Sequence, residues 1–133
     1  MLEVSAAIIT DGTRVLCFQK GEAKRSYLSY KFEYPGGKLE PGETPEAALI
    51  RELGEELSMK IDESQIRRFA DIVHDYDDFS VLIHYMFVFD KDPKYVMKEH
   101  ISAQWVPLLE VTKLDWVGAD LKASEMLEAS GIE

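Results

Sequence analysis

Three glutamates in the middle of the chain, Glu52, Glu55 and Glu56, have a spacing that could do chemistry. Separations of three and four residues place their side chains next to one another on a helix. Like charges arranged in this way repel, so they cost stability unless a cation lies among them. Crowded carboxylate oxygens suit a hard divalent cation such as Mg²⁺ or Mn²⁺. The alternative is an acidic helix face that only contacts water, which is the commoner origin of such a pattern.

A helix over Pro45–Leu57 is predicted to carry these glutamates. Thr44 can cap its first free N–H groups, and proline is tolerated at the first helical position. Gly54 costs about 1 kcal/mol relative to alanine without ending the helix. On a 3.6-residue period, an apolar arc lies beside the acidic one. This apolar arc consists of Leu49, Ile50, Leu53 and Leu57.

The residues before this helix predict a loop that suits a phosphate group. The tetrapeptide Tyr-Pro-Gly-Gly at 34–37 allows a tight turn and a close approach of the backbone to a ligand. A Pro-Gly pair at 41–42 adds a second turn just before the helix. Anions favour the N-terminus of a helix, because unpaired N–H groups and the helix dipole point there. The stretch therefore combines a phosphate-binding loop with a metal-binding helix face.

The segment from 37 to 59 resembles the signature of the Nudix hydrolase family, G-x5-E-x7-R-E-U-x-E-E-x-G-U, in which U is an aliphatic residue. The matching residues are Gly37, Glu43, Arg51, Glu52, Leu53, Glu55, Glu56 and Met59. Ser58 stands where the second glycine usually ends the helix in a left-handed turn. A serine there costs about 1 kcal/mol but removes no metal ligand. From the first strand to the last helix, the chain is similar to the small MutT-like branch of this family.

This resemblance implies a fold and a set of metal ligands. The fold is an α/β/α sandwich, a mixed β-sheet with helices on both faces, as a single domain over residues 1–133. The implied metal ligands are the carbonyl oxygen of Gly37 and the carboxylates of Glu52, Glu55 and Glu56. Arg51 would hydrogen-bond a ligand carboxylate, with Glu43 balancing its charge. The alternative for Arg51 and Glu43 is a surface ion pair worth about 0–1 kcal/mol.

In MutT-like relatives, a glutamate on the loop before the last strand binds metal or removes a proton from the attacking water. Glu99 falls at that place, and the alternative is an ordinary loop glutamate. Glu55 is a second candidate for the proton acceptor, and His100 is a third.

The resemblance also implies residues that bind the substrate. Lys20 ends the second strand, where relatives contact a phosphate, although a lysine there is usually only solvated. Lys24 and Arg25 could reach the same site from the next loop. Tyr34 corresponds to an aromatic residue beside the nucleobase, with core packing as its alternative. Asp120 corresponds to a residue that reads the base edge, with a helix cap as its alternative.

Two further points concern the base. A carboxylate at 120 would accept hydrogen bonds and so favour amino or imino N–H groups on the base. Trp116 could stack on the base or pack in the core.

Composition limits the partners. The net charge of −10 argues against binding of a nucleic-acid polymer, whose phosphates need Lys and Arg. It leaves room for a small phosphate compound, because a bound metal ion reverses the local charge. Cys17 is the only cysteine and lies in an apolar run, so we expect a buried thiol and no internal disulfide. No membrane-spanning run and no signal peptide are evident, so we expect a cytoplasmic monomer or homodimer without membrane contact.

The rest of the chain predicts a mostly β domain. Strands are expected at 4–10, 14–19, 66–76, 79–89 and 101–106, with an extended lead at 31–34 and a hairpin turn at 77–78. The first strand and the strand at 79–89 are apolar on both faces, so both should be covered on two sides. A short helix is expected at 108–114, and a final amphipathic helix runs from 118 to about 129. Its apolar face is marked by Leu121, Ser124, Met126 and Leu127.

The activity implied by the resemblance is hydrolysis of an NTP or dNTP to the monophosphate and diphosphate, with Mg²⁺ as cofactor and Mn²⁺ as its substitute. CTP, dCTP and oxidised dGTP are candidate substrates. One alternative is hydrolysis of a nucleotide sugar or dinucleotide such as ADP-ribose, against which the lack of an extra N-terminal dimerisation domain counts. Another is a nucleotide-binding module without catalysis, against which the intact set of glutamates counts.

Overall fold

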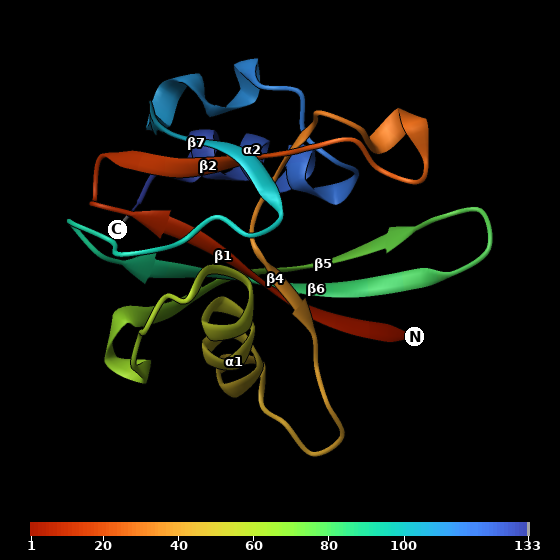
Figure 1. The fold of residues 1–133 in the computed structure, drawn as a ribbon, viewed down its shortest axis with the longest axis horizontal. Helices are drawn as coiled ribbons and strands as arrows, with labels where there is room; N and C mark the ends of the chain where they lie inside the picture. The colour runs from red at the N-terminus through yellow and green to blue at the C-terminus, as the bar shows by residue number, and fades with distance from the viewer. Residues whose placement is uncertain (133) are drawn as a thin grey trace.

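The computed structural model describes residues 1–132 and shows a mixed β-sheet with one α-helix on each face (Figure 1). The strands are β1 (Leu2–Thr10), β2 (Arg14–Lys20), β3 (Phe32–Glu33), β4 (Gly36–Lys38), β5 (Ile66–Asp75), β6 (Ser80–Phe89) and β7 (His100–Pro107). The helices are α1 (Pro45–Leu57) and α2 (Ala119–Ser130), with 3-10 turns η1 (Ser26–Leu28), η2 (Glu63–Gln65) and η3 (Leu108–Lys113). The predicted α/β/α sandwich is confirmed, and the short helix expected at 108–114 is η3.

Strand β1 organises the sheet, because it pairs with strands on both sides. It runs parallel to β6 along its whole length and antiparallel to β4 over Val4 to Ala6. It pairs with β2 only where Thr10 faces Val15, so the two strands diverge beyond their shared turn. Strands β3 and β7 flank β2, and β5 pairs with β6. Strand β4 therefore lies where β1 and β2 separate, and it leads the chain directly toward α1.

The expectation of a glycine loop at 34–37 is only partly right, because Gly36 and Gly37 belong to strand β4. A Cβ atom at position 36 would lie 1.9 Å from the carbonyl oxygen of Ser5 on β1. Glycine is therefore needed for close strand pairing here rather than for a free phosphate-binding turn.

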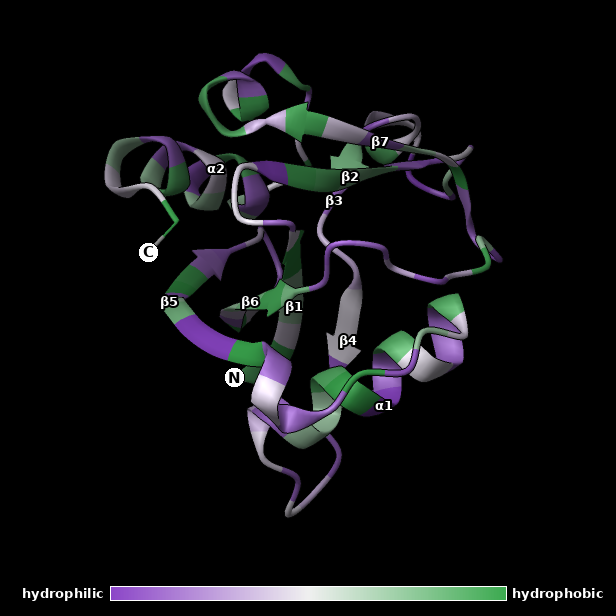
Figure 2. Ribbon diagram, turned by 90° about the vertical axis from the view of Figure 1, so that its left-hand side faces the viewer, coloured by the Kyte–Doolittle hydropathy of each residue, from purple (hydrophilic) through white to green (hydrophobic). Residues whose placement is uncertain are grey.

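Two cores lie on opposite faces of the sheet, one under each helix (Figure 2). Alternation along β1 sends Ala6 and Ile8 to the α2 side, and Ala7 and Ile9 to the α1 side. Strand β6 divides in the same way, which confirms that both strands are covered on two faces. Cys17 is fully buried, as expected, and burial raises the pKa of its thiol to about 12.

Helix α1 begins and ends as its sequence predicts. The hydroxyl oxygen of Thr44 accepts a hydrogen bond from the Ala47 N–H at 3.1 Å. At the other end Ser58 has φ of 50°, in the left-handed region, and the Met59 N–H donates to the Leu53 carbonyl. The Ser58 N–H itself donates to the Gly54 carbonyl at 3.1 Å, which is the hydrogen bond of the αL helix ending. Ser58 therefore adopts the conformation that the signature normally gives to glycine.

The predicted apolar face of α2 is partly wrong. Leu121 and Met126 remain 42% and 38% exposed, whereas Ser124 and Leu127 are buried. The buried face consists of Ala119, Asp120, Ala123, Ser124 and Leu127. Its residues recur at four-residue intervals and most are small, so the helix can lie close to the sheet. The sequence interpretation took the large apolar residues as the buried face. It was partly wrong because close packing of α2 on the sheet favours small side chains. No described helix is both long and apolar enough to span a bilayer.

Replacing Ser58 with glycine should stabilise the protein by about 0.5–1 kcal/mol, because a left-handed φ is strained for serine. Thermal unfolding would measure the change as a raised Tm. Ser130 is the matched control, since it lies in the last turn of α2 and Ser130→Gly should not stabilise. An equal or lower Tm for Ser58→Gly would contradict this account of the helix end.

Candidate active site

The acidic face of α1 lies against strand β4. A Cβ atom at position 37 would lie 2.3 Å from Cδ of Glu52, so the Glu52 carboxylate rests directly on the Gly37 backbone. Only glycine leaves room for this contact. The structure thus brings together two groups that the sequence assigned to metal binding, from a strand and a helix fifteen residues apart.

Arg51 holds this arrangement from the solvent side. Its Nε and Nη2 atoms donate to the two Glu43 carboxylate oxygens at 2.8 and 2.9 Å. Its Nη1 donates to Glu52 at 2.8 Å and to Glu55 at 3.3 Å, and Nη2 also donates to the Lys38 carbonyl at 2.9 Å. The hydrogen bond from Arg51 holds the pKa of Glu43 down at about 2. The expected bond from Arg51 to a candidate ligand is present, and the separate bond to the Lys38 carbonyl ties α1 to the end of β4.

Glu56 lies in a more buried environment, with 11% of its side chain exposed. Burial raises its pKa to about 7, and the negative charges of Glu33, Glu99 and Glu52 add to this effect while His100 opposes it. His100 Nε2 lies 2.9 Å from Oε1 of Glu33 and 3.6 Å from Oε1 of Glu56. Carboxylates with poorly compensated charge are the donor set that suits a hard divalent cation, so these residues fit Mg²⁺.

Glu33 is a member of the cluster that sequence reasoning missed. It lies on the two-residue strand β3, and its carboxylate is 3.5 Å from Nζ of Lys20. Burial alone would raise the pKa of Glu33, but the hydrogen bond from His100 and the charge of Lys20 lower it overall. A signal was available, because a charged residue between two aromatic residues, Phe32 and Tyr34, indicates a side chain that faces a polar site.

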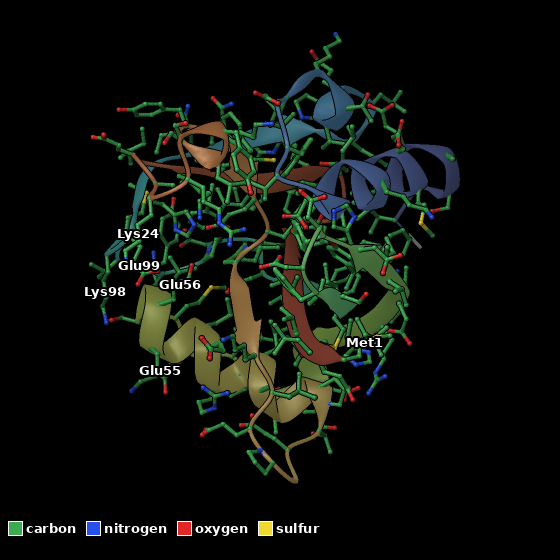
Figure 3. All side chains as sticks on the ribbon, turned by 90° about the vertical axis from the view of Figure 1, so that its right-hand side faces the viewer. Met1, Lys24, Glu55, Glu56, Lys98 and Glu99 are labelled. Atoms are coloured by element: carbon green, nitrogen blue, oxygen red, sulfur yellow. The ribbon has the colours of Figure 1, made fainter. Side chains whose placement is uncertain are left out.

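Lys20, Glu55 and Glu99 border this cluster from separate elements. Figure 3 shows Glu55 and Glu56 at one end of α1 and Glu99 on the neighbouring loop, with Lys24 on the same side. Nζ of Lys98 donates to the carbonyl oxygen of Glu55 at 3.0 Å, which fastens that loop to α1. Glu55 and Glu99 are exposed, so a ligand can reach both carboxylates from solvent.

A cavity of about 290 Å³ opens on the α2 side of the sheet. Its lining includes Leu28, Glu33, Tyr34, Gly36, Phe79 and Asp120. Glu33 therefore belongs both to this cavity and to the cluster around Glu56. The arrangement gives a mostly apolar hollow next to a group of carboxylates, which suits a base and its phosphates respectively.

Asp120 is buried at the inner end of the cavity. It accepts hydrogen bonds from the Tyr34 N–H at 3.0 Å and from the Tyr85 hydroxyl at 2.5 Å. Burial raises its pKa to about 7. The N-cap of α2 is Gly118, and no side chain caps that end, so the helix-cap interpretation of Asp120 is wrong.

The rings of Tyr34 and Trp116 pack in the core. They stack with centroids 4.4 Å apart, and the Tyr34 hydroxyl pairs with Oγ of Ser124 at 2.6 Å. The Trp116 Nε1–H donates to the Val111 carbonyl at 2.7 Å. Trp116 is 4% exposed, so its core interpretation holds, whereas Tyr34 also lines the cavity.

Comparison with known proteins agrees with this geometry. Residues 1–126 match the family described as NUDIX domain. The chain is 36% identical over 87 residues to the 8-oxo-dGTP diphosphatase of Proteus vulgaris, covering 65% of this chain and 75% of that protein. It is 28% identical over 119 residues to the enzyme of the same name from Escherichia coli, covering 90% of each. Among solved structures, the E. coli ORF135 protein superposes with a TM-score of 0.81 at 27% identity, covering 97% of this chain and 89% of that one.

The contact between Gly37 and Glu52 can be tested with a pair of glycine variants. Gly37→Ala should displace the Glu52 carboxylate, whose end can turn away, and so weaken Mn²⁺ binding by about tenfold or more without unfolding the protein. Gly54→Ala is the matched control on the same helix, because a Cβ there meets nothing within 4 Å. It should stabilise α1 by about 1 kcal/mol. Titration of Mn²⁺ and thermal unfolding would measure both effects, and unchanged Mn²⁺ affinity in Gly37→Ala would contradict the assignment.

Metal affinity should depend on pH through Glu56. Its pKa of about 7 means that its carboxyl group is protonated below that pH in the metal-free protein. Because a proton and a cation compete for the same oxygens, the dissociation constant for Mg²⁺ should rise by up to about tenfold per pH unit below about pH 7 and level off above it. Calorimetry in buffers of different ionisation enthalpy would also detect proton release on binding. A constant affinity between about pH 6 and about pH 8 would contradict the prediction.

Proposed function

Because the chain belongs to the NUDIX family and is a MutT-like hydrolase of phosphoric anhydrides, we propose that it hydrolyses nucleoside triphosphates. The proposed reaction converts an NTP or dNTP and water into the monophosphate and diphosphate, with Mg²⁺ as cofactor. The observation that carries the proposal is the Glu52 carboxylate on the Gly37 backbone, with Glu56 in the same acidic cluster and the cavity beside it.

The metal would be held by Glu52, Glu55 and Glu56 and by the Gly37 carbonyl, with Glu99 as a further ligand or as the proton acceptor. When bound, such an ion neutralises phosphate charge and lowers the pKa of a coordinated water. The protein supplies position: Arg51 keeps Glu52 in place, and Lys20 offers a positive charge at the end of β2. The cavity near Glu33 would bind the base and keep the triphosphate pointed toward α1.

The cavity supports a preference about the base. Asp120 already accepts one hydrogen bond on each carboxylate oxygen, and each oxygen keeps a second lone pair. As a carboxylate it favours a base edge with an amino or imino N–H group. Cytosine offers an amino group, and oxidised guanine offers an imino group, so CTP, dCTP and 8-oxo-dGTP are the substrates to test first. Two relatives carry the name 8-oxo-dGTP diphosphatase, which supports the last of these.

Two alternative functions remain open to test. An ADP-ribose-type substrate has the same phosphoric anhydride, and would leave AMP and ribose phosphate as products. A binding module without catalysis would retain nucleotide affinity with no turnover. The intact group of carboxylates around α1 favours catalysis, because it costs stability that binding of a base does not require.

Glu55→Gln and Glu56→Gln should each lower turnover by orders of magnitude, about 10²-fold or more, because each removes a charged metal ligand. Glu125→Gln is the control, since Glu125 is exposed on α2. Initial rates of diphosphate release, with added Mg²⁺, would measure the effect while circular dichroism checks the fold. Unchanged release in both variants would reject the metal assignment.

The same assay should be run as a panel of NTPs, dNTPs, 8-oxo-dGTP and ADP-ribose, with products identified by mass. We expect a monophosphate and diphosphate. Exclusive formation of AMP and ribose phosphate would support the first alternative, and nucleotide binding without any product would support the second.

A further inference from the structure

His100 is the one member of the acidic cluster whose role neither the proposed reaction nor the signature explains. It is the first residue of β7, and 1% of its side chain is exposed. Its Nε2 lies between two carboxylates, 2.9 Å from Glu33 and 3.6 Å from Glu56. Among the described residues, its Nδ1 has no hydrogen-bond partner.

Packing fixes the direction of this ring. Its centroid is 5.2 Å from that of the fully buried Phe18, which lies on the adjacent strand β2. The backbone of His100 pairs with that of Lys20, where a register shift marks the end of the ladder. A buried ring held on a strand in this way has few alternative rotamers. Its Nε2 therefore stays directed between Glu33 and Glu56.

The missing partner of Nδ1 distinguishes two roles for the His100 ring, metal ligand and hydrogen-bond donor. A histidine that binds a metal almost always donates its other ring N–H to a carboxylate, carbonyl or water. Nδ1 of His100 has no such acceptor among the described residues, so a proton on Nδ1 would be buried and unsatisfied. The favourable tautomer places the proton on Nε2, which then donates to Glu33. The geometry points to His100 as a hydrogen-bond donor to Glu33 rather than a metal ligand.

We propose that His100 is a positioning residue: its Nε2–H donates to Glu33, and the same edge of the ring lies against Glu56, so that the ring fixes where the two carboxylates lie. Without this ring, Glu33 would keep the Lys20 ammonium at 3.5 Å, but Glu56 would face Glu33 as a second partly buried carboxylate and would turn away from the metal position. Glu33 also lines the cavity, so the same ring joins the cavity wall to the metal-binding face. The inference rests on the proposed metal role of Glu56 and adds a residue to it.

Two amide variants test the position of the donor. The amide introduced by His100→Gln reaches about as far as Nε2 of the imidazole, so its N–H can still meet Glu33. The amide introduced by His100→Asn reaches only as far as Nδ1, so it removes the donor between Glu33 and Glu56 and leaves Glu33 with Lys20. We expect Mn²⁺ affinity, followed by the EPR signal of free Mn²⁺, to fall by about 10–100-fold in His100→Asn and by less than about threefold in His100→Gln. Folded His100→Leu protein should lose Mn²⁺ affinity by about the same factor as His100→Asn.

His84 provides a matched control. It is another buried histidine between two carboxylates, with Nδ1 2.8 Å from Asp71 and Nε2 2.9 Å from Glu3. Its two partners lie on β1 and β5, whereas Glu56 lies in the last turn of α1. His84→Asn should therefore lower the Tm but leave Mn²⁺ affinity unchanged. An equal loss of affinity in this control would mean that instability alone explains the effect, and would overturn the proposal.

Spectroscopy separates the positioning role from direct ligation. Pulsed EPR of the Mn²⁺-loaded protein should show no directly coordinated ¹⁴N. A ligand nitrogen signal that disappears in His100→Gln would overturn the proposal, as would equal Mn²⁺ affinity in wild type and His100→Asn. None of these readouts needs a nucleotide, so a protein that binds Mn²⁺ but releases no diphosphate would reject the proposed reaction and not the role of His100.

Discussion

Negative charge concentrated at the last two turns of α1 is the constraint on which the rest of the site depends. Glu52, Glu55 and Glu56 cannot be separated without giving up the helix, so the surroundings must balance them. Arg51 does so on one side, through bonds to Glu43 and Glu52. On the buried side His100 lies beside Glu56, whose pKa is raised by burial and further by the neighbouring carboxylates. A divalent cation at this position would relieve the repulsion, so the charge that weakens the helix is also the source of metal affinity.

The sheet places this charge where a substrate can reach it. Strands β1 and β2 meet at one residue pair and then separate, and β4 enters the gap between them. That path brings Gly37 against Glu52 and carries the chain from the cavity wall to the helix in a few residues. Glu33, Tyr34 and Gly36 line the cavity, whereas Gly37 lies against Glu52 of α1. This short extended segment therefore joins the cavity to the acidic face of α1, the two parts to which base and metal binding are assigned in the proposed function.

The parts of the molecule that the sequence predicted best are those set by local rules. The cap at Thr44, the apolar arc of α1 and the two-sided burial of β1 follow from spacing and residue type. Strand β4 was missed because its glycines are required by contacts with residues distant in sequence, Gly36 with Ser5 and Gly37 with Glu52. The buried face of α2 was misassigned because close packing selects Ala123 and Ser124 over larger residues.

The site residues also divide into those that a local sequence pattern predicts and those that depend on contacts distant in sequence. The signature identified Glu52, Glu56 and Arg51 from positions on one helix. Glu33 and the burial of His100 depend on three strands meeting, β2, β3 and β7, which no local pattern encodes. The placement of Asp120 against Tyr85 likewise joins a helix to a distant strand. Roles for these residues stay predictions until the variants are measured.

The buried thiol of Cys17 can report local unfolding of the sheet around strand β2. The thiol is the only one in the chain, it has no exposure, and burial raises its pKa to about 12, so an alkylating reagent finds almost no thiolate in the folded state. Modification must wait for strand β2 to leave the sheet. The rate of labelling under native conditions therefore measures the free energy of that opening. Strand β2 also carries Lys20. A ligand that binds Lys20 should therefore stabilise β2 in the sheet and slow the labelling without contacting the sulfur.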